Sequence, residues 1–145
     1  MKNTKCIVVL GKSNTGKTTS LKLLISSLSK KYEDILHSSY SDIRVTNDVI
    51  EGFLINGYKV GIMTEGDMDL CVKYGLTFFK DYDLVIGASH LYGKTIEEYF
   101  NHYKNDELLF LIKPKSEIIY VKSDNDSFAK KLEELLMITL SSKGC

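Results

Sequence analysis

The sequence predicts an α/β domain whose sheet is mostly parallel and carries one antiparallel hairpin strand. Short apolar runs, typical of buried strands, alternate along the chain with longer segments whose apolar residues recur at helical spacing. Two apolar runs flank Asn56-Gly57, a pair typical of the type I′ turn that joins antiparallel strands. We expect residues 1–145 to form one domain, because 145 residues suit a single hydrophobic core.

The first half of the chain is predicted to contain one helix and the hairpin. A strand at residues 5–10 precedes a helix at 17–31, and residues 32–41 could form a short strand or a loop. The hairpin strands are predicted at 49–55 and 58–63. The second of them is apolar enough to be internal, so we expect it beside the first strand of the chain. The other hairpin strand is then an antiparallel edge.

The second half is predicted to alternate between helices and strands. We expect helices at 68–80, 96–103 and 126–140, and strands at 83–88, 108–113 and 117–122. Thr95 and Glu98 have the spacing of a capping box at the start of the middle helix. Ligands bind such sheets at the carboxyl ends of the strands. The loops that follow predicted strands should therefore converge on one site: 11–16, 64–67, 88–95 and 122–126.

The charge and the cysteine content indicate which kinds of binding partner and which cellular compartment to expect. With 19 basic and 19 acidic residues the formal net charge is zero, which argues against a nucleic acid as the main partner. No apolar run approaches the roughly 18 residues of a membrane span, so we expect no membrane insertion. Cys6, Cys71 and Cys145 are odd in number and lack metal-ligand spacing. They indicate reduced thiols in a cytoplasmic protein.

A phosphate-binding motif stands between the first predicted strand and the first predicted helix. Residues 11–18 read GKSNTGKT and fit the pattern G-x-x-x-x-G-K-[ST]. Gly11 and Gly16 allow backbone angles closed to other residues and leave room for phosphate oxygens. The amides of residues 14–18 would point inward at the positive end of the helix, where anions bind.

With this motif in that context, the chain resembles the P-loop NTPases, a superfamily of three-layer α/β sandwiches. The resemblance implies that Lys17 reaches the β- and γ-phosphates of a nucleoside triphosphate and that the Thr18 hydroxyl binds Mg²⁺. ATP is the expected nucleotide, with GTP possible. Thr19 suits packing or capping as well as nucleotide contact. The predicted nucleotide-binding residues are Gly11, Ser13, Asn14, Thr15, Gly16, Lys17, Thr18 and Thr19.

Two acidic residues follow the second hairpin strand and are candidates for catalysis. P-loop enzymes carry an acidic residue at the end of a strand near the phosphate loop, where it positions Mg²⁺ and water. We therefore assign catalytic roles to Glu65 and Asp67 beside Lys17, and a metal contact to Asp67 beside Thr18. The segment also resembles the D-x-x-G switch of GTPases, although Met63 stands where the aspartate would be. Alternatively, Asp67 could simply cap the next helix.

For polar residues elsewhere in the chain, the sequence pattern gives weaker support for a functional role. Ser89, His90 and Lys94 lie in the predicted loop after strand 83–88 and could contact phosphate or a second substrate, or could be surface residues. Arg44, the sole arginine, could act on a transferred phosphate or be a solvated residue at a strand edge. Asp124 resembles the aspartate of the guanine-reading N-K-x-D motif.

The match to the guanine-reading motif is incomplete, because Val121 replaces its asparagine; this favours ATP. Asp83 precedes its strand, at the end away from the predicted site, and is expected at the surface. His37 and His102 lack the spacing of metal ligands, so no zinc site is expected.

Three functions fit the sequence. The first is Mg²⁺-dependent hydrolysis of ATP or GTP. The second is a small kinase that transfers the γ-phosphate to a nucleotide or another small acceptor. Such kinases carry several arginines over the phosphates, whereas this chain would have to use lysines such as Lys94 and Lys104. The third is a nucleotide-binding module without turnover.

Overall fold

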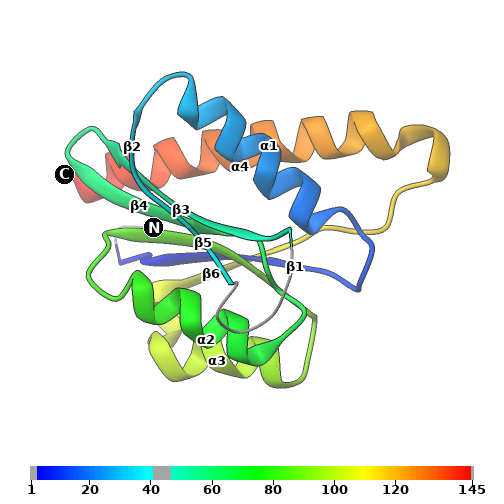
Figure 1. Ribbon diagram of the computed structural model, residues 1–145, viewed down its shortest axis with the longest axis horizontal. Coiled ribbons are helices and arrows are strands. Elements are labelled where there is room, and N and C mark those ends of the chain that lie inside the picture. Colours follow the sequence, from blue (N-terminus) through cyan, green and yellow to red (C-terminus); the bar gives the residue numbers. More distant parts are fainter. Residues whose placement is uncertain (1–2, 41–46, 145) are drawn as a thin grey trace.

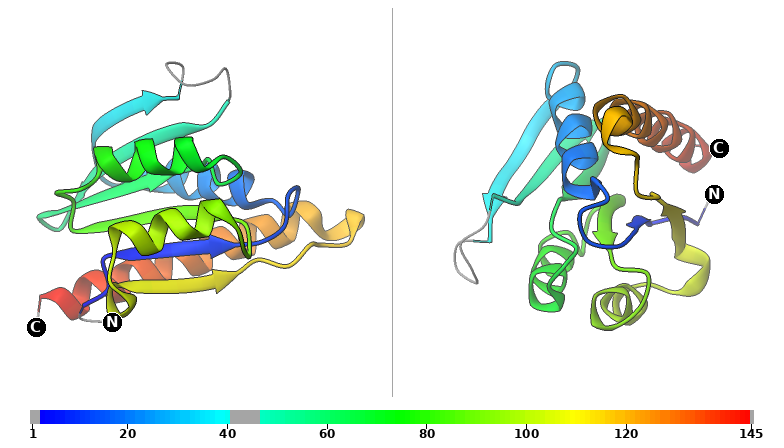
Figure 2. Two further views of the ribbon diagram at one scale, coloured as in Figure 1. Left: turned by 90° about the horizontal axis from the view of Figure 1, so that it is seen from below. Right: turned by 90° about the vertical axis from the view of Figure 1, so that its right-hand side faces the viewer.

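The computed structural model describes residues 3–40 and 47–144, which form one mixed sheet between two helical layers (Figure 1). Helices α1 and α4 cover one face, and α2 and α3 cover the other (Figures 1 and 2). The strands are β1 (Cys6–Leu10), β2 (Glu33–Ser39), β3 (Val49–Ile55), β4 (Tyr58–Met63), β5 (Leu84–Ser89) and β6 (Leu108–Ile112). The helices are α1 (Lys17–Ser29), α2 (Asp69–Phe78), α3 (Lys94–His102) and α4 (Val121–Lys143), with short 3₁₀ turns η1 (Asn105–Glu107) and η2 (Ile118–Tyr120). The α/β class and the mostly parallel sheet are therefore confirmed.

The order of the strands is β2-β3-β4-β5-β1-β6, which corrects two predictions (Figure 2). The second hairpin strand, β4, does not lie beside β1, because β5 pairs in parallel with both and separates them. The antiparallel strand β3 is not the edge either, since residues 33–39 form β2 outside it. Apolar content predicts burial, and all residues of β1 and β5 are buried, but it does not distinguish between neighbours in the sheet.

The hairpin turn has the predicted conformation. Asn56 has φ of 52° and Gly57 has φ of 85°, as a type I′ turn requires. The twist of this turn matches that of the strands it joins, and β3 and β4 pair from Ile50–Met63 to Ile55–Tyr58. The hairpin thereby delivers the carboxyl end of β4 to the same edge of the sheet as those of β1 and β5.

Two predictions in the second half of the chain are wrong. Residues 117–122 do not form a strand but the turn η2 and the start of α4. Ile118 and Ile119 are 92% and 80% exposed, so their apolar pattern does not reflect burial in a sheet. The capping box before α3 is absent as well: Gly93 is the N-cap and no side chain caps the helix.

The core consists of two layers of apolar side chains, one on each face of the sheet. The first packs Ile7, Val9, Phe53 and Ile86 against α1 and α4, and the second packs residues such as Val8, Ile50 and Val85 against α2 and α3. Alternate residues of the strands thus serve opposite layers. Within the described residues, none of the helices combines the length and apolarity needed to cross a membrane. Arg44 and Cys145 lie outside the described residues.

Candidate functional site

The loop at residues 11–16 connects β1 to α1, and each of its two motif glycines has a separate structural reason. Gly16 has φ of 89°, which side-chain-bearing residues rarely adopt, and a Cβ there would lie 2.3 Å from Asn125 Oδ1. Gly11 is needed for close approach instead: its Cβ would lie 2.8 Å from the carbonyl oxygen of Lys113. Asn14 also has positive φ, of 63°. The loop is therefore held in a tight turn whose shape depends on these positions.

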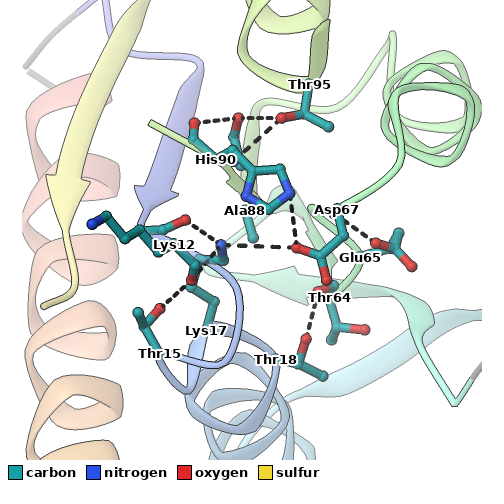
Figure 3. A network of polar contacts seen from close by, with 12 residues as sticks. Lys12, Thr15, Lys17, Thr18, Thr64, Glu65, Asp67, Ala88, His90 and Thr95 are labelled. Carbon is teal, nitrogen blue, oxygen red and sulfur yellow. Dashed lines mark hydrogen bonds and ion pairs between the residues drawn. The ribbon is translucent and has the colours of Figure 1, made fainter. Parts of the chain in front are cut away.

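Lys17, the first residue of α1, turns its side chain back over the loop (Figure 3). Its ammonium donates to the carbonyl oxygens of Gly11 at 2.5 Å and Lys12 at 3.2 Å, and it lies 4.0 Å from Asp67 Oδ1. Burial lowers the pKa of Lys17, and the charges of Asp67 and Glu65 oppose that shift. A largely buried cation thus stands at the N-terminus of a helix, the end at which helices bind anions.

The hydroxyl groups of this loop link it to itself and to β4. Thr18 Oγ1 donates to the carbonyl oxygen of Thr64 at 3.2 Å, and Thr15 Oγ1 donates to that of Lys12 at 2.9 Å (Figure 3). The pocket in front of the loop has a volume of about 170 Å³ and is lined by Asn14, Thr15, Gly16, Lys17, Thr18, Thr19 and Asp67. The structure thus brings together most of the predicted site residues. Gly11, Ser13 and Glu65 are not among the lining residues.

The two acidic candidates lie next to each other but differ in environment. Glu65 is buried, and its Oε1 accepts a hydrogen bond from the amide of Asp67 at 2.7 Å. Burial raises the pKa of Glu65. The hydrogen bond from the Asp67 amide opposes this shift, and the nearby Asp48 and Asp67 carboxylates add to it. Asp67 is more than half exposed and points its carboxylate into the pocket. It does not cap α2, because Met68 is the N-cap residue and no side chain caps that helix.

The loop after β5 contributes His90. Its Nε2 lies 3.2 Å from Asp67 Oδ1, so Asp67 stands between His90 and Lys17 (Figure 3). Thr95 anchors this loop: its Oγ1 accepts hydrogen bonds from Ser89 Oγ at 3.0 Å and from the His90 amide at 3.3 Å. The Thr95 hydroxyl is therefore used to fix the position of His90 and not to cap α3.

Gly66 allows the acidic loop to approach β5. A Cβ at Gly66 would lie 2.6 Å from the carbonyl carbon of Ala88, which is backbone and cannot move aside easily. The loop at 64–67 consequently packs directly on the carboxyl end of β5, the strand that separates β4 from β1. This contact brings Asp67 to Lys17, although β4 is not adjacent to β1.

Sequence reasoning missed Lys113, which follows β6 and is almost fully buried. Its Nζ donates to the carbonyl oxygen of Thr15 at 2.8 Å and lies 5.6 Å from the centre of the Phe128 ring. Burial lowers the pKa of Lys113, and the charge of Asp124 opposes the shift. The signal in the sequence is a lysine directly after an apolar strand that ends at the same edge as the phosphate loop.

Other candidates lie apart from the pocket. Asp124 lines a separate pocket of about 250 Å³ with Lys113 and Phe128, and residues 122–126 belong to α4 and not to a loop after a strand. His37 pairs with Glu51 across β2 and β3. Asp83 accepts a hydrogen bond from the Lys59 amide and is exposed, as expected for a surface residue.

The remaining predicted residues do not add to the pocket. Lys94 is the exposed first residue of α3, and His102 bonds to the carbonyl oxygen of Glu98 near the end of that helix. Across residues 3–40 and 47–144, no three His, Cys, Asp or Glu side chains form a group that could hold a metal ion by themselves.

Comparison of the chain with protein-family models, with curated proteins and with solved structures gave no match. The functional interpretation therefore depends on the geometry of the pocket and on the motif that forms it.

Proposed function

We propose that this protein binds a nucleoside triphosphate in the pocket at residues 14–19 and hydrolyses it with Mg²⁺. The observation that carries this proposal is the Lys17 ammonium, buried at the N-terminus of α1 and bonded to the loop's own carbonyl oxygens. A phosphate group in the pocket offers that cation a stronger, charge-assisted partner than a neutral carbonyl oxygen. The amides at the start of α1 supply further donors for the same anion.

The pocket also offers oxygen donors of the kind that Mg²⁺ prefers. The Thr18 hydroxyl and the Asp67 carboxylate line the same pocket, and Mg²⁺ in phosphate sites is held by one or two such groups together with phosphate oxygens. Both groups would have to leave their present partners, the Thr64 carbonyl and His90. When bound, the metal would neutralise charge on the phosphates.

Hydrolysis requires a positioned water molecule, and Asp67 is the residue best placed to hold it. The Asp67 carboxylate is exposed to the pocket, whereas Glu65 is buried and tied to the Asp67 amide. Water held by Asp67 would attack the terminal phosphorus as the bond to the bridging oxygen breaks. Glu65 then acts as a positioning residue that fixes the backbone of Asp67.

Phosphate release and thermal stability together test the proposal. A hydrolase releases phosphate from ATP or GTP alone, a kinase does so appreciably only with an acceptor, and a binding module gains thermal stability without turnover. We expect MgATP to raise the melting temperature and phosphate to be released from ATP without an acceptor. No stabilisation by any triphosphate would contradict the proposal.

Between the two bases, we expect ATP to bind more tightly than GTP. The guanine-reading motif is incomplete at Val121, and Asp124 lines a pocket other than the one at residues 14–19. Competition of unlabelled ATP and GTP against one fluorescent nucleotide measures this preference. A strong preference for GTP would contradict the prediction and make Asp124 a candidate for the base contact.

A further inference from the structure

The two edges of the sheet differ in how well they resist pairing with another strand. Edge strands are usually protected by charged residues, bulges or proline, since their free amides and carbonyls can pair with another chain. β2 has this protection: it carries Glu33, Asp34 and His37, and its register shifts at a bulge between Asp34 and Leu36. β6 reads Leu-Leu-Phe-Leu-Ile and pairs regularly with β1 along its whole length. It has none of these protective features.

The outer side of β6 presents a regular row of hydrogen-bonding groups. Lys113 donates its amide to Leu10 of β1, and the register pairs Leu10 with Ile112. Because backbone groups alternate in direction along a strand, Leu109 and Leu111 face β1, whereas Leu108, Phe110 and Ile112 face outward. Among the residues that the structure describes, the only strand paired with β6 is β1.

We propose that β6 pairs with β6 of a second copy of this chain, in antiparallel orientation about a twofold axis at Phe110. This inference does not depend on the proposed function. In this register Phe110 faces its own copy and Leu108 faces Ile112, so the three outward residues of each strand exchange about six hydrogen bonds. The two sheets become one continuous sheet through an isologous interface, the commonest kind in homodimers.

Charge and exposed apolar surface at this edge favour a second copy in that orientation. The exposed Asp106 precedes β6 and the exposed Lys115 follows it, so antiparallel pairing places an acidic residue of one strand beside a basic residue of its partner. Parallel pairing would bring like charges together. Ile112 is 63% exposed and Phe100, which contacts Phe110, is 48% exposed. The second copy would cover both.

Sedimentation velocity of the full chain over a range of concentrations tests the proposal with a matched pair of variants. Wild-type protein is expected to reach about twice the 16.4 kDa of one chain. Ile112→Lys should weaken dimerisation by tenfold or more, because it places a charge opposite Leu108 of the second copy. Ile138→Lys is the control: Ile138 is 56% exposed on α4, away from β6, and its substitution should leave the dimer intact.

Amide hydrogen exchange of the wild-type protein provides a second measurement that requires no variant. The outward amide of Phe110 should become at least tenfold more protected as the concentration rises from monomer to dimer, while the inward amide of Leu109 changes little. A monomer at about 100 µM, or a dimer in which Phe110 exchange does not change, would overturn the proposal. The first result would leave β6 available to a different partner, and the second would place the dimer interface elsewhere.

Discussion

At the scale of single residues, Lys17 and Asp67 determine what the pocket can bind. A buried cation is costly unless it is paired, and Lys17 is bonded to two carbonyl oxygens with a carboxylate 4.0 Å away. These partners hold the ammonium over the loop at the pocket. In the proposed function, an incoming phosphate would replace these neutral acceptors by charged ones without rearrangement of the helix.

Asp67→Asn is expected to reduce phosphate release by about tenfold or more while leaving nucleotide affinity nearly unchanged. The carboxylate acts mainly on the transition state, where it orients water and charge. Because Asp67 does not cap α2, the melting temperature should also change little. Asp69→Asn, an equivalent change in the first turn of α2, is the control. Full activity in Asp67→Asn would assign the positioning of water to another residue.

Glu65→Gln is expected to stabilise the protein at neutral pH. Burial raises the pKa of Glu65 above its ordinary value of 4.5, so the folded protein holds this proton more tightly than the unfolded chain. This tighter proton binding stabilises the folded protein at low pH. The stabilisation is lost as the pH rises from about 4.5 through the pKa of Glu65 in the folded protein. Glutamine does not ionise and avoids that loss.

Thermal denaturation of wild type and Glu65→Gln between pH 4.5 and pH 8 measures this effect. The advantage of Glu65→Gln should be largest at the highest pH and should shrink as the pH falls toward about 4.5, the ordinary pKa, below which the wild-type carboxyl becomes neutral in both states. Glu97→Gln, on the exposed side of α3, is the control. A difference in melting temperature that stays constant with pH would show that folding does not raise the pKa of Glu65.

At the scale of elements, the loop at residues 11–16 is supported by strands and helices that are distant in the sequence. Lys113 after β6 bonds to Thr15, and Asn125 on α4 lies against Gly16. Thr18 bonds to Thr64 at the end of β4. Each side of the loop is thus fixed by a different element.

Lys113→Met is expected to weaken MgATP binding by up to about tenfold. A hydrogen bond from a charged donor contributes roughly 1.5–3 kcal/mol, and without it the Thr15 carbonyl loses its fixed position. Methionine fills a similar volume, so the surrounding core should remain packed. Calorimetric titration compares this variant with Lys131→Met, an exposed neighbour on α4. Equal affinities would show that the loop keeps its shape without Lys113.

The sequence was sufficient to predict the elements that local patterns define. The hairpin turn at Asn56-Gly57 and the apolar runs of β1 and β5 each depend on residues close in the chain, and these elements are confirmed. The strand at 117–122 was wrong because an apolar run can also be exposed. Ile118 and Ile119 show that hydrophobicity alone does not establish a strand.

The neighbours of each element could not be predicted in the same way. Nothing in the apolar sequence of β5 shows that it lies between β1 and β4, since this depends on the packing of the whole sheet. The prediction that Asp67 lies near Lys17 assumed that β4 was next to β1. The two residues are close for another reason: Gly66 packs against Ala88 at the end of β5.

At the scale of the whole molecule, the carboxyl ends of β1, β4 and β5 lie together at one end of the sheet. The candidate residues lie at that end (Figure 3). α1 and α4 cover one face of the sheet and α2 and α3 cover the other. The helices therefore leave the carboxyl ends of the strands uncovered. Ligands of α/β sheets bind at these ends.

The central claim is that the loop at residues 11–18 binds a triphosphate, and calorimetric titration of MgATP into Lys17→Ala tests it most directly. Loss of a charge-assisted contact worth about 1.5–3 kcal/mol should weaken binding by about tenfold or more. Lys12→Ala is the matched control, because the Lys12 side chain is exposed and only its carbonyl oxygen contacts Lys17. We predict wild-type affinity for Lys12→Ala and a large loss for Lys17→Ala. Unchanged affinity in a folded Lys17→Ala protein would contradict the account.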